Sequence, residues 1–221
     1  MSTLDKKHRK DLEKTMERLD SSFFFYDLDH LANHLDSMRK VLDPNIKLWY
    51  ACKANPMSAI LKVFRNLDFG IDVASQGELD QVLRAGIKPE GIISTGPSKS
   101  RKYLKSLIQN EIKVVVCESI NQAYWLNDIA KELGARPQVL LRVQLDWDKG
   151  SSVLGGDAIT PFGIGIKDWE DLDKGRTQHL NILGLHTFQW GNILNLSELE
   201  KIWTETILKL KTLSEKIKVP L

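Results

Sequence analysis

The stretch that decides the fold is residues 47–73, KLWYACKANPMSAILKVFRNLDFGIDV, in which a short apolar run is followed by a turn, a helical segment and a second apolar run. The two runs begin at Lys47 and Phe69, and further runs begin at Gly91 and Lys113, so that successive runs start 22 residues apart. Short strands that alternate with helices at a fixed period are typical of βα units and of a parallel sheet. The sequence therefore predicts an α/β fold.

Six strands are predicted in this repeat, at residues 48–52, 69–73, 91–94, 114–117, 139–143 and 182–188. Apolar residues follow helical spacing at residues 27–41, 57–66, 79–85 and 102–108. Gly86 and Gly134 follow helical segments, where a left-handed C-cap is expected. An aromatic run at residues 23–26 also has the character of a strand. Residues 144–161 are rich in Gly, Ser and Asp, which predicts a mobile excursion.

Composition limits the class of protein. A chain of 221 residues with 42% hydrophobic and 27% charged residues is expected to be soluble and globular, with one sizeable core. Its net charge of +2 argues against a polybasic nucleic-acid binder, and no apolar stretch approaches the length of a membrane span. Residues 1–20 form a charged N-terminal extension without a signal sequence, so we expect a cytoplasmic protein. Cys52 and Cys117 are expected to be buried free thiols.

Four polar residues stand near the carboxyl ends of predicted strands, each between apolar neighbours: Lys53, Asp72, Arg142 and His186. Because side chains alternate faces along a strand, all four are expected to point into a barrel at the end where barrel enzymes carry their chemistry. An amine at that position can attach a carbonyl cofactor, and desolvation would lower its pKa. The alternative is that Lys53 is a solvated lysine and that each residue only marks where a strand leaves the core.

An ordered set of motifs resembles the fold-type III pyridoxal-phosphate decarboxylases, a family that includes ornithine, lysine, diaminopimelate and carboxynorspermidine decarboxylases. The resemblance runs from about Phe23 to Leu213, and its motifs are residues 50–56, 70–79, 140–143, 162–163 and 184–188. It implies an alanine-racemase-like (β/α)8 TIM-type barrel, of which residues 21–221 hold about six of the eight βα units. It also implies that a C-terminal β-domain would follow the barrel.

The resemblance assigns roles around pyridoxal 5'-phosphate. Lys53 would form a Schiff base with the cofactor, Asp72 and Glu78 would organise the lysine and the ring surroundings, and Arg142 would supply a fixed positive charge. His186 and Phe188 would complete the cofactor site, and no metal is implied. Two alternatives remain open. The first is that Arg142 has a structural role, as the partner of Asp72 or Glu78 in a buried ion pair. The second is that Ser75 is a helix N-cap, with Glu78 completing a capping box.

The chain also departs from the family pattern. Many relatives have a second histidine where Phe188 stands, and a phenyl ring can stack there but cannot donate a hydrogen bond. A Gly-Ser pair that helps to hold the phosphate aligns with Trp190-Gly191. Without the hydroxyl, phosphate binding would depend on backbone N–H groups or on other residues.

The function implied is decarboxylation of a basic amino acid by a homodimer, feeding polyamine or lysine metabolism. The family's glycine-rich phosphate loop, its acidic partner of the pyridine nitrogen and a cysteine from the second subunit are not found in this sequence, and residues 218–221 resemble the approach to a seventh strand. We therefore expect a fragment that is not competent alone. The alternatives are a catalytically inactive relative that binds a protein partner, and an amino-acid racemase.

Overall fold

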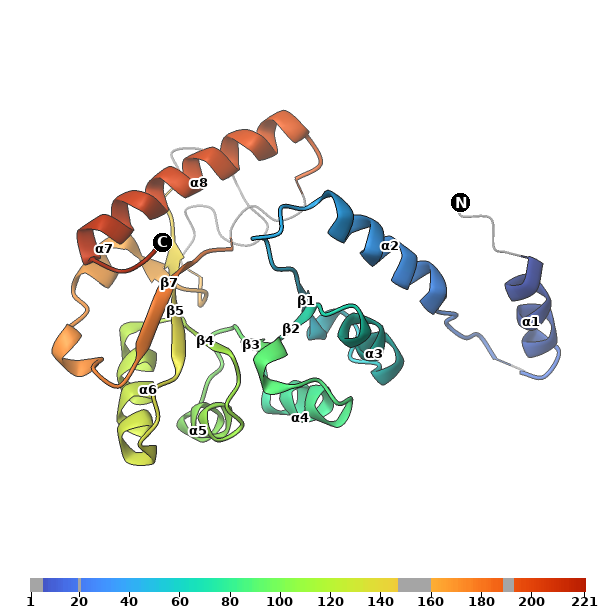
Figure 1. Cartoon of the computed structure of the whole chain (residues 1–221), viewed down its shortest axis with the longest axis horizontal. Helices are drawn as coiled ribbons and strands as arrows, with labels where there is room; N and C mark the ends of the chain where they lie inside the picture. Colours follow the sequence, from blue (N-terminus) through green and yellow to red (C-terminus); the bar gives the residue numbers. More distant parts are fainter. Residues whose placement is uncertain (1–5, 20, 147–159, 189–192) are drawn as a thin grey trace.

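The computed structural model describes residues 6–19, 21–146, 160–188 and 193–221. These residues form a parallel sheet with helices packed along one face (Figure 1). Its strands are β1 (Trp49–Ala51), β2 (Gly70–Val73), β3 (Ile92–Ser94), β4 (Val114–Cys117), β5 (Gln138–Gln144), β6 (Ile164–Gly165) and β7 (Asn181–His186). The α-helices are α1 (Lys6–Met16), α2 (Leu28–Val41), α3 (Ser58–Asn66), α4 (Gln76–Arg84), α5 (Arg101–Gln109), α6 (Ile120–Leu133), α7 (Ile166–Glu170) and α8 (Leu196–Ile217).

The strands run side by side in sequence order from β1 to β5, and β7 then pairs with β5, all in parallel. The helices α3 to α6 lie along the outside of this arc, while α8 lies against β7 and α1 and α2 extend away from the sheet (Figure 1). This arrangement confirms the predicted α/β fold, and the sheet corresponds to about six strands of a barrel. Short β6 pairs with β5 over only two residues, and it was not predicted.

The outer face of the sheet forms the core with the helices. Ile71, Ile92, Val139 and Leu141 alternate along their strands and are fully buried. Tyr50 also faces outward and stacks on Phe64 of α3 with ring centroids 4.0 Å apart. Burial of these apolar side chains is the main favourable term that holds the βα units together.

The inner face, opposite to these helices, carries the residues of the other parity. Register pairs place Trp49 beside Gly70, Ala51 beside Asp72, and Arg142 beside His186. A Cβ on Gly70 would lie 2.1 Å from the ring of Trp49, so the glycine leaves room for the indole. The parity predicted for Trp49, Ala51, Asp72, Arg142 and His186 is therefore confirmed.

Serine hydroxyls start the helices that follow β2, β3 and β4. Ser75, Ser100 and Ser119 each accept a hydrogen bond from the backbone N–H three residues later. Such N-caps satisfy backbone donors that the first helical turn leaves free. Gly86 and Gly134 have positive φ angles of 79° and 62° after α4 and α6, which confirms the expected left-handed C-caps.

Three predictions about strand boundaries were wrong. Residues 23–26 are not a strand, because no described strand pairs with them, and their aromatic side chains are exposed. The first strand ends at Ala51, where the chain turns into the 3₁₀ helix Cys52–Ala54. The last strand ends at His186 and does not reach Phe188. The predicted excursion at 144–161 lies largely outside the described residues.

No α-helix in the described ranges is long and apolar enough to span a membrane. Cys52 and Cys117 are buried and free, as predicted. Desolvation raises the pKa of the Cys52 thiol to about 11 and that of Cys117 to about 12.

Candidate cofactor site

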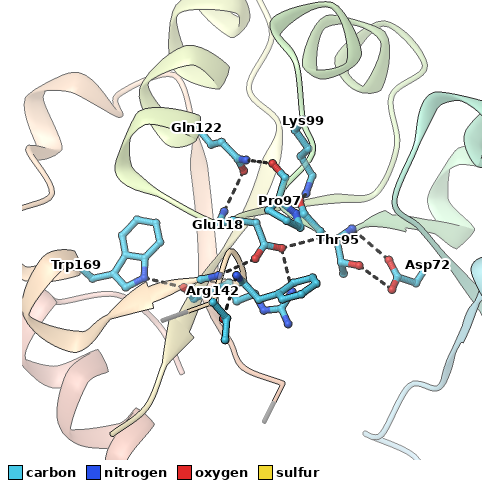
Figure 2. Close-up of polar contacts among 12 residues, drawn as sticks. Asp72, Thr95, Pro97, Lys99, Glu118, Gln122, Arg142 and Trp169 are labelled. Atoms are coloured by element: carbon cyan, nitrogen blue, oxygen red, sulfur yellow. Dashed lines mark hydrogen bonds and ion pairs between the residues drawn. The ribbon is translucent and has the colours of Figure 1, made fainter. Parts of the chain in front are cut away.

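The carboxyl ends of parallel strands meet at one edge of the sheet, and this edge holds a cluster of buried polar side chains (Figure 2). The cluster comprises Asp72 from β2, Thr95 and Lys99 after β3, Glu118 after β4, and Arg142 from β5. Three of these are almost fully buried, with exposed fractions of 3% for Lys99, 2% for Glu118 and 5% for Arg142. Buried charges are costly unless they are paired, so such a group is a candidate functional site.

Asp72 is tied to the segment that follows β3. Its Oδ2 accepts a hydrogen bond from the Thr95 hydroxyl at 2.9 Å, and its Oδ1 accepts one from the Thr95 backbone N–H at 3.2 Å. Burial raises the pKa of Asp72, while the bonds from Thr95 and the charges of Lys99 and Lys53 oppose that rise. The carboxylate therefore lies within electrostatic reach of Lys53.

Lys53 lies in the 3₁₀ turn Cys52–Ala54, immediately beyond β1. Its side chain is exposed, so the desolvation expected for this amine is not observed. The physical reason is local: the chain leaves the strand at Ala51, and Lys53 stands past the sheet edge, where no described element buries it. Lys53 is open to solvent, and its charge still opposes the raised pKa of Asp72.

Glu78 serves as a cap of α4. Its Oε2 accepts a hydrogen bond from the Ala74 backbone N–H at 2.8 Å, and its own N–H donates to Ser75 Oγ at 3.2 Å. Ser75 is thus confirmed as the N-cap of α4, but the expected capping box is not formed, because the Glu78 carboxylate binds the backbone N–H of Ala74 and not that of Ser75. Glu78 also lies near the lysine turn, because its negative charge contributes, after burial, to the raised pKa of Cys52.

Glu118 connects three segments and was missed by the sequence analysis. Its Oε1 accepts hydrogen bonds from the Gly96 backbone N–H at 2.7 Å and from Arg142 Nη1 at 3.1 Å. Its Oε2 accepts one from the Gly163 backbone N–H at 2.9 Å. The parity rule applied to the other strands would have found it, since Glu118 directly follows the apolar run Val114–Cys117.

Arg142 forms its ion pair with Glu118. The alternative partners expected from the sequence, Asp72 and Glu78, were wrong, because Glu118 on the adjacent strand end lies closer to the guanidinium. The ring of Phe162 lies 4.8 Å from the Arg142 guanidinium carbon, at cation–π distance. Trp169 Nε1 donates to the Arg142 carbonyl at 2.8 Å.

Lys99 is a second buried cation that the sequence analysis missed. Its Nζ donates to the Gly96 carbonyl oxygen. Burial lowers its pKa to about 8, and the negative charge of Glu118 opposes this effect. Its position in a short Pro-Ser-Lys segment gave no signal, because loop lysines are ordinarily solvated.

His186 ends β7 beside Arg142 in the register. Its Nδ1 is buried and has no hydrogen-bond partner among the described residues. Burial lowers the pKa of His186 to about 3, and the charges of Arg142 and Lys99 lower it further. The imidazole is therefore neutral, and it leaves one buried polar atom for a bound group to satisfy.

Phe188 lies past the end of β7 and is 50% exposed. With His186 it borders a largely apolar cavity of about 570 Å³ between β7 and α8, which Ile202, Trp203 and Ile207 also line. Trp190 and Gly191, which align with the family's Gly-Ser pair, lie outside the described residues.

These residues fit pyridoxal phosphate. They provide an amine on Lys53, a carboxylate on Asp72, a guanidinium on Arg142 and a neutral imidazole with a free buried nitrogen on His186. The groups of three or more His, Cys, Asp or Glu side chains that a metal ion needs are absent from the described ranges. A parallel βα sheet with this set of side chains at its carboxyl edge is the arrangement expected of part of a pyridoxal-phosphate barrel.

Comparison with known proteins agrees with this class. The family model of the pyridoxal-binding domain of pyridoxal-dependent decarboxylases matches residues 28–201. The chain belongs to this family, which confirms the resemblance and the cofactor predicted from the sequence.

Two curated relatives are similar over most of the chain. The L-glutamyl-[BtrI acyl-carrier protein] decarboxylase of Niallia circulans is 29% identical over 182 residues, which are 81% of this chain and 42% of that protein. The diaminopimelate decarboxylase of Aquifex aeolicus is 28% identical over 211 residues, 93% of this chain and 50% of that protein. The chain thus spans about half the length of these relatives.

A solved structure supports the fold. The diaminopimelate decarboxylase of Helicobacter pylori, complexed with L-lysine, superposes with a TM-score of 0.83 at 23% identity. The match covers 95% of this chain and 54% of that one. This confirms that the parallel sheet corresponds to part of a decarboxylase barrel.

Proposed function

We propose that this chain forms the cofactor-binding part of a pyridoxal-phosphate decarboxylase that acts on a basic amino acid. The observation that carries the proposal is the register pair of Arg142 and His186, with its unsatisfied imidazole nitrogen at the same sheet edge as Asp72 and Lys53. The diaminopimelate decarboxylase of Aquifex aeolicus, matched along 93% of this chain, supports a basic substrate.

Lys53 is the residue that holds the cofactor in this proposal. Its exposed amine is accessible to an aldehyde, so Lys53 would hold the cofactor through this nitrogen. The Asp72 carboxylate lies within electrostatic reach of this amine, whose charge opposes the rise that burial causes in the Asp72 pKa. Bound pyridoxal phosphate supplies the electron sink for the loss of carbon dioxide.

Arg142 and His186 form the floor of the site. Burial of the ring, and after it the charge of Arg142, keep His186 neutral, so that its Nδ1 either accepts or donates one hydrogen bond without adding a second cation. Asp72, held by Thr95, gives the opposite charge on the Lys53 side. Glu78 fixes the start of α4 beside the lysine turn, and Phe188 borders the cavity next to His186.

The test is release of carbon dioxide by the whole protein of which this chain would be the cofactor-binding part, purified with pyridoxal phosphate and measured with diaminopimelate, lysine, ornithine and arginine. We expect release with one of them, loss of release in Lys53→Ala, and no loss in Lys62→Ala, which removes an exposed lysine on α3. Inversion of the substrate without carbon dioxide release would identify a racemase. Absence of any bound cofactor would identify a non-catalytic relative.

We also propose that residues 21–221 are part of a larger barrel domain, preceded by the extension 1–20, and that the protein works as a cytoplasmic homodimer. Exposed apolar side chains on α8 support a further covering element or subunit; these are Leu196, Trp203, Ile207 and Leu208. Light scattering of the purified protein tests the dimer, and a monomeric mass would contradict it.

A further inference from the structure

The buried carboxylate of Glu118 is the point where three segments of the candidate cofactor site meet. It receives hydrogen bonds from the turn after β3 through Gly96, from β5 through Arg142, and from the segment before β6 through Gly163. With an exposed fraction of 2%, it has exchanged solvent for these three donors. A carboxylate in this environment is held in one orientation.

The backbone of Glu118 is held by the side chain of Gln122, in the first turn of α6. The Glu118 backbone N–H donates to Gln122 Oε1 at 3.1 Å, and Gln122 Nε2 donates to the Pro97 carbonyl at 2.7 Å. The same glutamine therefore holds both the start of α6 and the segment after β3 (Figure 2). The carboxylate has little freedom to follow Arg142 if the guanidinium moves.

Arg142 is enclosed on three sides. Glu118 binds Nη1, the Phe162 ring covers the guanidinium, and Gly163 lies so close that a Cβ there would be 2.8 Å from the Arg142 carbonyl oxygen. Gly163 has a φ angle of 75°, which a side chain would make unfavourable. Arg142 is the register partner of His186, and its charge reaches the imidazole, because it adds to the effect of burial in lowering the His186 pKa.

Charge balance gives Glu118 a second effect. Arg142 and Lys99 are both buried cations, and Arg142 cannot lose its proton. Glu118 is the carboxylate whose charge most strongly opposes the lowered pKa of Lys99, and it pairs directly with Arg142. Without that charge, the Arg142 guanidinium would be driven toward solvent and away from His186.

We propose that Glu118 is a positioning residue of the cofactor site that acts through Arg142, while the backbone N–H groups of Gly96 and Gly163 hold the carboxylate itself in place. This proposal rests on the proposed function. It predicts that the carboxylate touches neither cofactor nor substrate, and that its effect on cofactor binding requires Arg142.

The test is a double-mutant cycle with Glu118→Gln and Arg142→Gln in the purified protein. Glu118→Gln keeps the size of the side chain and one acceptor oxygen but removes the charge. We expect it to weaken binding of pyridoxal phosphate by about 10- to 100-fold, as loss of a supporting residue does at other bound groups. In the Arg142→Gln background the same change should cost less than about threefold, because interacting residues are not additive.

Asn127→Ala is the matched control, because it removes another buried hydrogen bond, from His179 N to Asn127 Oδ1 at 2.9 Å, far from this sheet edge. It should lower the melting temperature without weakening cofactor binding. Should Glu118→Gln fail to fold, Glu118→Asp takes its place in the cycle, since its shorter side chain cannot reach all three donors. Equal losses from the Glu118 change with and without Arg142 would overturn the proposal, as would an equal loss in Asn127→Ala.

A second readout needs no cofactor. The Arg142 Nε–H signal in ¹H–¹⁵N spectra should be sharp in the parent protein and broadened by solvent exchange in the Glu118 variant, and it should be unchanged in Asn127→Ala. A sharp signal in the Glu118 variant would overturn the positioning role. If the parent protein binds no pyridoxal phosphate, the proposed function fails, and this spectrum still decides the role of Glu118.

Discussion

Lys99 offers a quantitative test of the electrostatics at the sheet edge. Burial lowers the pKa of Lys99 from its ordinary value of 10.5 to about 8. At about 1.4 kcal/mol per pKa unit, holding this lysine charged in the folded protein costs about 3 kcal/mol at pH 7. Lys99→Met removes that cost but also removes the hydrogen bond to the Gly96 carbonyl, which contributes about 1 kcal/mol. We therefore expect the variant to be more stable at pH 7 by about 2 kcal/mol.

The pH dependence of unfolding shows whether the charge of Lys99 is destabilising. Between pH 8 and pH 10.5 the unfolded chain binds a proton at Lys99 that the folded chain does not, so the stability contributed by this site rises with pH across that window. The advantage of Lys99→Met should accordingly shrink as the pH rises and be lost by about pH 10, where the remaining cost of the charge equals the contribution of the hydrogen bond. Urea unfolding of both proteins at pH 7, 9 and 10.5 measures the difference.

The control is Lys102→Met, which changes an exposed lysine of α5 and should shift stability by less than about 0.5 kcal/mol at every pH. The reasoning would be refuted if Lys99→Met were destabilised equally at all three pH values. That result would mean that attraction to Glu118 outweighs desolvation and that Lys99 is a stabilising partner of the cluster.

Three further predictions follow from the packing. Gly70→Ala should destabilise the protein by about 1–3 kcal/mol in urea unfolding, because the new Cβ would overlap the Trp49 ring. The control Gly77→Ala should stabilise it, because a Cβ at this position of α4 meets open space. Equal effects of the two changes would contradict the packing of Trp49 against Gly70. Trp169→Phe should lower stability by about 1 kcal/mol by removing the donor to the Arg142 carbonyl, and an unchanged urea midpoint would argue against that bond. At pH 8 a thiol reagent should label neither Cys52 nor Cys117 until the protein is denatured, because both thiols are buried with raised pKa values; rapid labelling of the native protein would show that one of them is accessible.

The regular part of the fold could be predicted because the hydrophobic pattern and the spacing of 22 residues between units determine it. The strands after residue 47 begin at Trp49, Gly70, Ile92 and Val114, within two residues of the predicted starts. The aromatic run at residues 23–26 could not be placed, because strand formation depends on a pairing partner that no local pattern reveals.

Site residues could be predicted only where they lie on a strand or directly after it, because only there do side chains alternate between the two faces. The inward placement of Asp72, Arg142 and His186 follows from the period of two, and so would have that of Glu118. The exposure of Lys53 did not follow, because the 3₁₀ turn after Ala51 interrupts the alternation. The burial of Lys99 depends on Gly96 and Glu118, which are close to it only in the folded chain.

The measurement that most directly tests the account is covalent trapping of the cofactor. The purified protein is incubated with pyridoxal phosphate, reduced with borohydride and digested, and the modified peptide is identified by mass spectrometry. The account predicts a single modified lysine, Lys53, with the label lost in Lys53→Ala and retained in Lys62→Ala. Equal labelling of several exposed lysines, or label on the peptide that contains Lys99 and none on Lys53, would contradict it.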